Sequence, residues 1–427
     1  MKKFILPLLG VLLYFLASEP AMASFTFQEE EMQTVDFASY KGEVIDSETK
    51  KPLVFATLTV EGTNISTVTN TEGNFLLKVP TDSQSESLVI TFLGYSSKTV
   101  SLASLNEENN EIALDVLVTE LPEVSISVPR EAINLVKETL RRKGENYLKD
   151  PSVMTAFYRE TIKKRRKNVS LSEAVVTIFK TPYTSSRRDA VQMYKSRKST
   201  DYSKLDTLVL KLQGGPFNAL FVDVMKYPEY IFAEESIDNY NFSFDRSTRI
   251  NDRLIYVINF RQQSNIREPL YEGKLYIDVE KKVLTSAIYS LNITDRAMAS
   301  RLFVRKKPRN ADVFPTEVAY RVDYREKDGR WYYGYSNAIL EFKIDWDRKL
   351  FNSVYSMTCE MAVTDWEKNQ ELSTPRYRDR LKSTMILSDE AVGFSDPDFW
   401  GEYNIIEPEK SIESAIRKIQ RQLKRSD

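Results

Sequence analysis

Hydrophobic and polar positions alternate with a period of two along residues 38–128. Turn-forming residues interrupt the alternation at 62–64 and at 70–73, where Gly or Asn adopts a positive φ at little cost. Because a single sheet would leave its apolar rows in water, the pattern predicts a β-sandwich of two packed sheets. The inward-pointing side chains come from three runs: Ala56, Leu58 and Val60; Phe75, Leu77 and Val79; Leu88, Ile90 and Phe92.

Longer alternating runs, rich in aromatic residues, fill residues 151–407. The stretch 271–291 alternates on both sides of a short charged turn and predicts one antiparallel hairpin. The stretch 318–344 is divided by Asp328 and Gly329, a pair of residues typical of tight hairpin turns. This succession predicts one large antiparallel sheet, curved around its apolar side.

Helical periodicity flanks this second region and also occurs once inside it. We expect helices at 129–150, at 203–225 and at 408–427. The first helix is expected to seat the sandwich on the sheet, and the other two to cap the sheet. The apolar stripes of the first and last helices are Ile133, Val136, Leu140 and Tyr147, and Ile412, Ala415, Ile416, Ile419 and Leu423.

The N-terminus has the three parts of a secretory leader. Lys2 and Lys3 precede an apolar run from Phe4 to Ala17, and a small-residue cleavage motif ends at Ala23. The apolar run is shorter than the roughly 20 residues that span a bilayer, which weighs against the alternative of a retained membrane anchor. We therefore expect residues 1–23 to be a signal peptide, and the rest of the chain to be exported to the periplasm or to associate with the outer membrane.

The first region resembles a known domain family in the order and spacing of its turn and strand residues. The matching motifs are Gly42 to Asp46, Pro52-Leu53, Ala56 to Val60, Gly62-Thr63, Thr67 to Phe75 and Leu88 to Tyr95. They resemble the carboxypeptidase-regulatory-like domain of Bacteroidetes cell-envelope proteins, a transthyretin-like sandwich of seven strands. The resemblance implies a role in docking or in folding support, because the module of this family carries no catalytic residues.

A weaker resemblance concerns the second region. The hairpin phrase from Tyr271 to Asp278, followed by Val283 to Leu291, is similar to half-barrel proteins related to outer-membrane lipoprotein carriers. Those proteins curve one antiparallel sheet around an apolar groove covered by helices. The fold class expected for the whole chain is therefore mainly β: a transthyretin-like β-sandwich followed by a large curved antiparallel sheet with capping helices.

The amino-acid composition excludes several kinds of catalytic and metal site. The 427 residues include no His and one Cys, which excludes imidazole bases, His-based zinc sites, intramolecular disulfides and every metal site built from several cysteines. The net charge of −1 offers no general attraction for nucleic acid. We expect no metal and no cofactor. Cys359 is expected to be a buried apolar residue rather than a nucleophile.

Three groups of residues are candidates for a site. Asp345 and Asp347 are spaced to share a strand face and form a candidate carboxylate pair for glycoside hydrolysis, which needs no His. Trp331, Tyr333 and Tyr335 are expected to share a face, either as a platform for a lipid or sugar or as ordinary core. The third group is a basic run that forms either a patch for anions or partners or a solvated turn: Lys163, Lys164, Arg165, Arg166 and Lys167.

These features favour a non-catalytic exported envelope protein. It would dock to envelope partners and bind an apolar, glycan or peptide ligand on its curved sheet. Two alternatives remain at this point: a carboxylate-dependent glycoside hydrolase, and a purely structural accessory of an outer-membrane complex. The partners expected are an envelope protein, a lipid or a glycan, and not nucleic acid.

Overall fold

The structure is a computed structural model that describes residues 36–410, apart from 84, 118–128, 166, 201–211, 246–247, 251–252, 305–308, 348–351 and 394–398. The predicted signal peptide and the predicted C-terminal helix beyond residue 410 lie outside the described residues. The helix expected at 203–225 lies outside the described residues only over 203–211. Residues 212–225 are described, and the prediction is wrong for them: they form turns and the short helix α3 (Phe217–Leu220), because Gly214 and Gly215 have positive φ and interrupt a helix.

The N-terminal region is a sandwich of two sheets with the strand orders β4-β1-β7 and β3-β2-β5-β6. The predicted β-sandwich is confirmed, and its described strands number seven, as the resemblance implies. Val44, Leu58 and Phe75 lie between the sheets with no exposed surface. The strands are β1 (Phe37–Asp46), β2 (Thr57–Val60), β3 (Ser66–Val68), β4 (Asn74–Pro80), β5 (Ser87–Thr91), β6 (Lys98–Ser101) and β7 (Asn110–Leu114), with the helical turn η1 (Leu102–Ser104) before β7.

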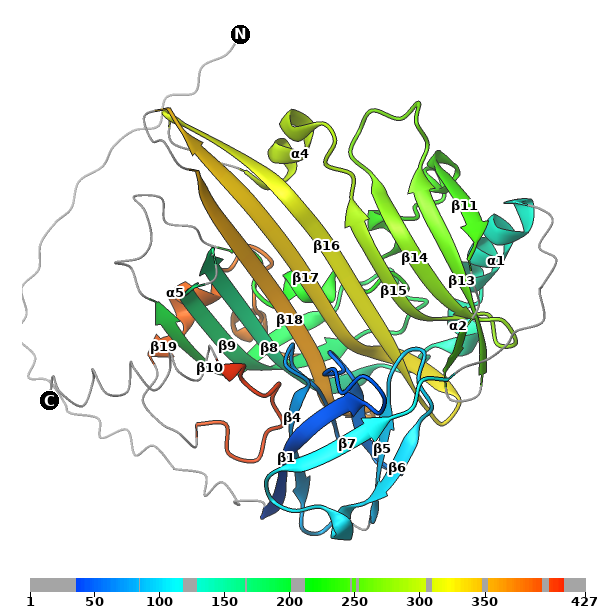
Figure 1. The fold of residues 1–427 in the computed structure, drawn as a ribbon, viewed down its shortest axis with the longest axis vertical. Helices are drawn as coiled ribbons and strands as arrows, with labels where there is room; N and C mark the ends of the chain where they lie inside the picture. The colour runs from blue at the N-terminus through cyan, green and yellow to red at the C-terminus, as the bar shows by residue number, and fades with distance from the viewer. Residues whose placement is uncertain are drawn as a thin grey trace, which may run out of the picture. The chain divides into compact units, whose positions relative to one another are not determined.

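The rest of the described chain forms one twelve-stranded sheet, in the order β11-β13-β14-β15-β16-β17-β18-β8-β9-β10-β19, with β12 beside β13 (Figure 1). Neighbouring strands are antiparallel except β10 and β19. The strands are β8 (Ser152–Lys164), β9 (Lys167–Lys180), β10 (Ala190–Thr200), β11 (Tyr240–Phe244), β12 (Thr248–Ile250), β13 (Arg253–Gln262), β14 (Tyr271–Asp278), β15 (Val283–Leu291), β16 (Ala311–Lys327), β17 (Arg330–Trp346), β18 (Ser353–Lys368) and β19 (Val392–Gly393).

Turn chemistry accounts for the two hairpins predicted from the sequence, and both are present. Asp328 and Gly329, between β16 and β17, have φ values of 52° and 73°. Positive φ at both central residues matches the right-handed twist of the flanking strands. The other predicted hairpin is formed by β14 and β15, which pair from Tyr271 to Asp278.

One side of the sheet, which we call the inner face, bears Tyr289, Ala338 and Cys359 and is covered by helices and loops. Helix α1 contributes Ala132 and Val136 to the core on this face. The expectation that this helix seats the sandwich is therefore wrong, because the sandwich packs against the opposite side. The remaining helices and helical turns are α1 (Pro129–Arg141), α2 (Lys143–Asn146), η3 (Pro228–Tyr230), η4 (Ile237–Asn239), α4 (Arg296–Phe303), η5 (Tyr377–Asp379) and α5 (Leu387–Glu390).

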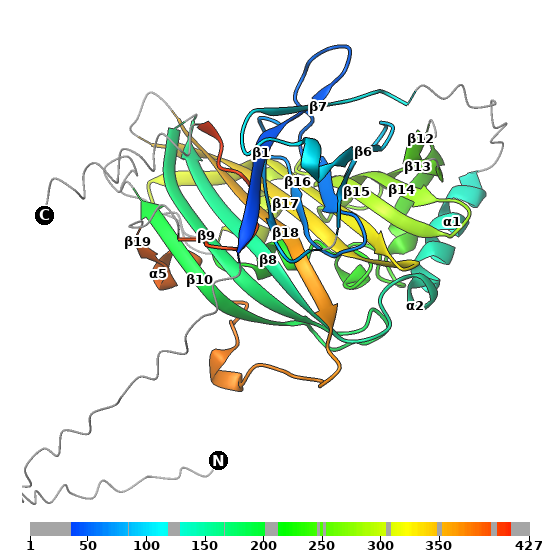
Figure 2. The ribbon, with the colours of Figure 1, turned by 90° about the horizontal axis from the view of Figure 1, so that it is seen from below.

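The opposite side, which we call the outer face, bears Phe157, Tyr335 and Ala362. These residues share a core with Val68 and Leu76 of the sandwich. The same core contains Trp400, Ile405 and Ile406, so a C-terminal segment at 399–409 lies between the sandwich and the sheet (Figure 2). The sandwich is therefore fixed to the sheet by shared apolar burial rather than tethered to it by a linker.

Hydrogen bonds hold the C-terminal segment to the sandwich. The side chain of Asn404 accepts from the backbone N–H of Lys78 at 2.7 Å and donates to the carbonyl of Lys78 at 2.9 Å. Thr67 donates to the carbonyl of Ile405 at 3.1 Å, and Asn70 donates to that of Glu407 at 3.0 Å. These bonds join side chains to backbone groups, so they hold the segment against the sandwich without a strand ladder.

No helix in the part of the chain that the structure describes has both the length and the apolar character needed to cross a membrane.

Replacing Asn404 by Ala is expected to lower the free energy of unfolding by about 1–3 kcal/mol, because two polar backbone groups of Lys78 lose their partner. Urea unfolding followed by circular dichroism measures the change. Asn241→Ala, at an exposed position of β11, is the control and should unfold at the same urea concentration as the unaltered protein. Coincident curves for the Asn404 and Asn241 variants would refute this account of the interface.

Candidate functional site

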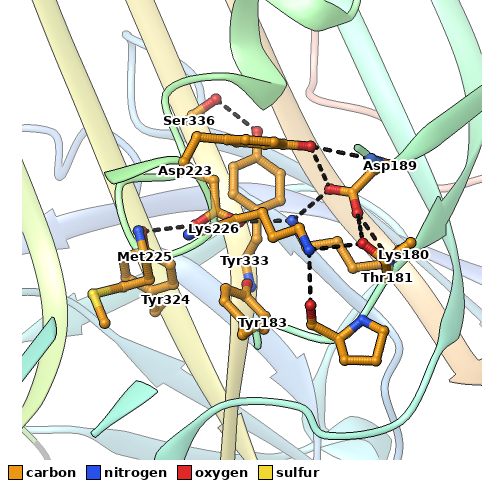
Figure 3. Close-up of polar contacts among 12 residues, drawn as sticks. Lys180, Thr181, Tyr183, Asp189, Asp223, Met225, Lys226, Tyr324, Tyr333 and Ser336 are labelled. Atoms are coloured by element: carbon orange, nitrogen blue, oxygen red, sulfur yellow. Dashed lines mark hydrogen bonds and ion pairs between the residues drawn. The ribbon is translucent and has the colours of Figure 1, made fainter. Parts of the chain in front are cut away.

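A buried charge cluster lies at the end of β9, on the inner face. The ammonium of Lys180 is 2.9 Å from a carboxylate oxygen of Asp189 and 2.7 Å from one of Asp223 (Figure 3). All three side chains are almost completely inaccessible to solvent. Asp189 precedes β10, and Asp223 lies in the loop after α3. The cluster therefore ties the β9–β10 hairpin to the segment that covers the inner face.

Tyrosines complete the surroundings of this cluster. The Lys180 ammonium lies 5.0 Å from the ring centre of Tyr183, 5.6 Å from that of Tyr333 and 5.8 Å from that of Tyr227. The Tyr227 hydroxyl donates to Asp189 at 2.9 Å. Ring faces attract a cation, so the aromatic residues stabilise the charge that the carboxylates pair.

The balance of burial and attraction keeps Lys180 charged. Burial by itself lowers the pKa of Lys180, but the attraction of Asp189 and Asp223 outweighs it and raises the pKa. For the neighbouring Lys226, burial dominates and lowers the pKa to about 8. The ammonium of Lys226 donates to the hydroxyl of Thr181 and to two backbone carbonyls. Every charged group here contacts another protein group, which is the arrangement of a structural cluster.

A second feature of the inner face is a continuous row of register partners on ten adjacent strands. The row begins with aromatic residues on β11, β13, β15 and β16, and it ends with polar residues on β8, β9 and β10. Its middle consists of the small residues Ala338 and Cys359. In order, the row is Phe242, Phe260, Gly273, Tyr289, Tyr320, Ala338, Cys359, Glu160, Ser172 and Lys198.

The aromatic end of this row, which we call the inner row, is partly accessible. The rings of Tyr271, Tyr289 and Tyr320 pack at 5.1–6.0 Å between centres, and Tyr271 and Tyr320 are only half-buried. A hollow of about 630 Å³ crosses β11, β13, β14 and β15. Most of the side chains that line it, such as Asn259 and Lys274, alternate with the inner-row residues and therefore lie on the outer face. Solvent reaches the aromatic end of the inner row at the half-buried Tyr271 and Tyr320.

The polar end of the inner row contains an unusual carboxyl group. Glu160 is 5% exposed, and the hydroxyl of Tyr158 donates to it at 2.8 Å. Burial raises the pKa of Glu160 to about 8, because no cation offsets the loss of water. Cys359, its register partner, is also buried, and burial raises the pKa of the thiol. Glu160 is therefore a neutral hydrogen-bond donor in neutral solution.

A separate cluster of charges lies on the outer face. Arg159 is 2.7 Å from Glu173 and 3.2 Å from Glu360, and it donates to the carbonyl of Ile406 at 2.7 Å. Arg197 pairs with the second oxygen of Glu173 at 2.8 Å. This network joins four strands, β8, β9, β10 and β18, to the C-terminal segment, and its burial beneath that segment indicates a structural role.

The candidate carboxylates do not converge on a cleft. Asp345 and Asp347 are both exposed, at the end of β17 and just beyond it. Asp345 has Asp312 of β16 as its register partner. A general acid for glycoside hydrolysis needs a desolvated position, which neither residue has.

The three candidate aromatic residues are brought into the core rather than onto a platform. Trp331 is 6% exposed, Tyr333 has no exposed surface and Tyr335 is 1% exposed. The expectation that they share a face is wrong, because a bulge between β16 and β17 leaves Gly334 without a partner. Tyr333 consequently lies in the inner core and Tyr335 in the outer one.

The basic run forms the turn between β8 and β9, with Arg165 at a φ of 56°. Lys163 pairs with Glu409 at 3.3 Å, and the ammonium of Lys164 lies over the ring of Tyr355. Arg166 lies outside the described residues. The two lysines thus contact their own chain, and the use of the run by a partner stays a prediction.

The sequence patterns did not reveal Lys180, Asp223 or Glu160. Lys180 and Asp223 are each one polar residue within or next to an apolar run, and they meet only in the folded chain. Glu160 stands between Arg159 and Thr161, where the sequence does not show that it is buried. A signal was present at Lys180, where a charged residue directly follows the apolar stretch 175–179. It does not identify the partner 43 residues away.

Residues 40–126 match the family model of the CarboxypepD_reg-like domain. This match confirms the resemblance seen in the sequence motifs. No curated protein matches the chain.

Several solved structures are distantly similar. An outer membrane lipoprotein-sorting protein domain from Vibrio parahaemolyticus is 10% identical, with 59% of this chain and 97% of that chain covered and a TM-score of 0.24. A DUF1329 family protein from Desulfovibrio piger is 11% identical, with coverage of 57% and 95% and a TM-score of 0.22. Lipovitellin is 7% identical, with coverage of 58% and 28% and a TM-score of 0.25.

Replacing Lys180 by Met is expected to cost about 3–5 kcal/mol of unfolding free energy, because two buried carboxylates lose their cation. Urea unfolding checks this value. Lys137→Met is the matched control, since the pair of Lys137 with Asp238 is exposed, and it should change stability by less than about 1 kcal/mol. Similar losses in the two variants would contradict the structural role of the cluster.

The raised pKa of Glu160 predicts a pH-dependent stability. Glu160 loses its proton near its ordinary pKa of 4.5 in the unfolded chain and near 8 in the folded protein. The stability that the folded protein gains by keeping Glu160 protonated is therefore complete below pH 4.5 and is lost as the pH rises through 8. Glu160→Gln should therefore reduce the loss of stability between about pH 5 and about pH 9 by several kcal/mol.

Urea midpoints measured at both pH values test the Glu160 prediction. The exposed residue Glu111 provides the control, as Glu111→Gln should leave the pH profile as it is in the unaltered protein. If the urea midpoint of Glu160→Gln changes with pH in the same way as that of the unaltered protein, Glu160 ionises normally in the folded state.

Proposed function

We propose that this chain is a non-catalytic exported protein of the cell envelope, which binds an amphipathic ligand along the inner row and docks to envelope partners through its CarboxypepD_reg-like domain. The inner row carries the proposal, because it is aromatic at one end, small in the middle and polar at the other end. We also propose the division of the chain into the sandwich (38–128), the linker helix (129–150), the curved sheet (151–407) and the C-terminal helix (408–427).

The order of side chains along the row matches a ligand with an apolar part and a polar part. Tyr289 and Tyr320 offer stacked ring surface, which favours an acyl chain or the face of a sugar. Ala338 and Cys359 at the centre of the sheet have small side chains and are 2% and 1% exposed. At the far end, Glu160 offers a hydrogen-bond donor while it stays protonated. Lipids, glycolipids and lipidated peptides have this succession of groups.

The polar clusters support binding rather than catalysis. Lys180 is shared between two carboxylates, and its side chain is 1% exposed. Arg159 is likewise shared between Glu173, Glu360 and a backbone carbonyl. A catalytic group needs an open position next to the substrate, and these groups have their neighbours inside the chain.

Strand β6 supports the docking role of the sandwich. It lies at the edge of its sheet in the order of the described strands, and Lys98, Thr99 and Ser101 along it are exposed. An edge strand is able to accept a further strand from another protein through backbone hydrogen bonds. The sandwich is fixed on the outer face, so a partner bound at β6 would stand at a constant position relative to the inner row.

Binding of a fluorescent fatty acid tests the ligand proposal. Ala338→Leu adds volume to the centre of the inner row and is expected to weaken binding at least about tenfold by steric exclusion. Ala319→Leu adds the same volume on the outer face, at a half-buried position of the neighbouring strand, and should bind as the unaltered protein does.

The unfolding midpoint of each variant shows that it is folded before binding is compared. Equal binding by the Ala338 and Ala319 variants would reject the inner row as the site. Native mass spectrometry of the protein isolated from its own cells adds a check that needs no chosen probe. A bound lipid or glycan in the unaltered protein, and its absence in Ala338→Leu, is the expected result.

A further inference from the structure

The loop that follows β18 has the most exposed apolar side chains among the described residues. Tyr377 is 84% exposed and Leu372 is 68% exposed. The loop projects away from the sheet as the orange segment below β18 in Figure 2. Large apolar side chains this exposed contribute little to packing within the chain, and an external partner would bury them.

The backbone of the loop is built to hold these side chains outward. Leu372 has a φ of 52°, a conformation that costs a non-glycine residue conformational energy. The side chain of Asn369 stabilises this turn by accepting from the N–H of Ser373 at 2.8 Å and donating to its carbonyl at 2.7 Å. The ordered turn thus imposes strain at a residue whose side chain contributes nothing to the core.

Both ends of the loop are anchored to the sheet. The N–H of Asn369 donates to the carbonyl of Pro151 at 2.9 Å, and the N–H of Leu381 donates to that of Val191 at 2.8 Å. Pro375 is buried at the base. The exposed tip is therefore carried on a fixed support, and it meets its partner without first having to fold.

Charge identifies the class of partner. The segment 369–384 contains four cations, at Arg376, Arg378, Arg380 and Lys382, against two carboxylates, at Glu371 and Asp379. All of these residues are exposed. Exposed apolar and aromatic side chains between basic residues are the combination by which proteins adhere to an anionic bilayer surface: the apolar groups enter the boundary of the acyl chains, and the cations contact lipid phosphates.

We propose that the 369–384 loop binds the surface of a lipid bilayer that contains anionic lipids, with Tyr377 and Leu372 inserted and the basic residues at the headgroups. This inference goes beyond the proposed function and does not rest on it. The inner row and the loop consist of different residues, so failure of one leaves the other intact.

Sedimentation with phospholipid vesicles tests the charge requirement. The unaltered chain is expected to sediment with vesicles that contain phosphatidylglycerol and to remain in solution with vesicles of phosphatidylcholine alone. The combined variant Arg376→Gln, Arg378→Gln, Lys382→Gln should bind about a hundredfold more weakly, at roughly fivefold per charge. The combined variant Lys41→Gln, Lys50→Gln, Lys51→Gln removes three exposed cations of the sandwich and should bind normally.

The apolar requirement is tested in the same assay. Leu372→Ser combined with Tyr377→Ser should weaken binding about tenfold or more, through the loss of inserted apolar surface. Leu302→Ser is the control, since Leu302 is 59% exposed on α4 and lies outside the loop. Every chain compared carries the same N-terminal run, so any contribution of that run to binding cancels.

A site-specific signal shows whether the loop itself enters the bilayer. The four native tryptophans are all 8% exposed or less, so Tyr377→Trp adds the one exposed indole. Phosphatidylglycerol vesicles with brominated acyl chains should quench this variant and leave the fluorescence of the unaltered protein almost unchanged.

Absence of quenching in Tyr377→Trp would overturn the proposal. Equal binding to phosphatidylcholine vesicles, or unchanged binding by the Arg376, Arg378 and Lys382 variant, would overturn it too. If the unaltered chain does not bind vesicles but retains an acidic protein through this loop, the loop is a protein-docking surface and the bilayer proposal is wrong.

Discussion

The central sheet has apolar residues on both faces, and this one constraint accounts for most of the architecture. In β9, eight consecutive residues from Val169 to Val176 are buried, although side chains alternate between the two faces. Both faces must therefore be covered. Helix α1 and the segment after α3 cover the inner face, whereas the sandwich and the C-terminal segment cover the outer one. The CarboxypepD_reg-like domain therefore contributes residues to the core on the outer face of the sheet.

Coverage of both faces brings charged residues into the interior, and pairing compensates for their burial. Lys180 is buried together with two aspartates on the inner face, and Arg159 with two glutamates on the outer face. Removing one partner of a buried ion pair lowers the stability of the fold strongly, whereas the intact pair adds little to it. The main effect of these pairs is therefore to fix which segments meet. Glu160 is the exception, because it is buried without a cation and remains neutral instead.

The two proposed contact regions differ in how they are exposed. The inner row is part of the sheet itself, and at its aromatic end Tyr320 and the neighbouring Tyr271 are half-buried. The 369–384 loop lies outside both cores and presents Tyr377 on an anchored turn. A protein that holds an amphipathic molecule in one place and touches a bilayer in another would bring that molecule close to a membrane.

The sequence by itself determined the mainly β class, the sandwich and the two hairpins, because alternation and turn residues such as Asp328 and Gly329 act over a few neighbouring positions. It also identified the CarboxypepD_reg-like domain, whose motifs are local. Only the tertiary structure decided which residues meet across the sheet. The bulge at Gly334 separates Tyr333 from Tyr335, and pairing between distant strands places Cys359 beside Glu160. Strand register depends on the packing of both faces at once, and no short window of sequence contains that information.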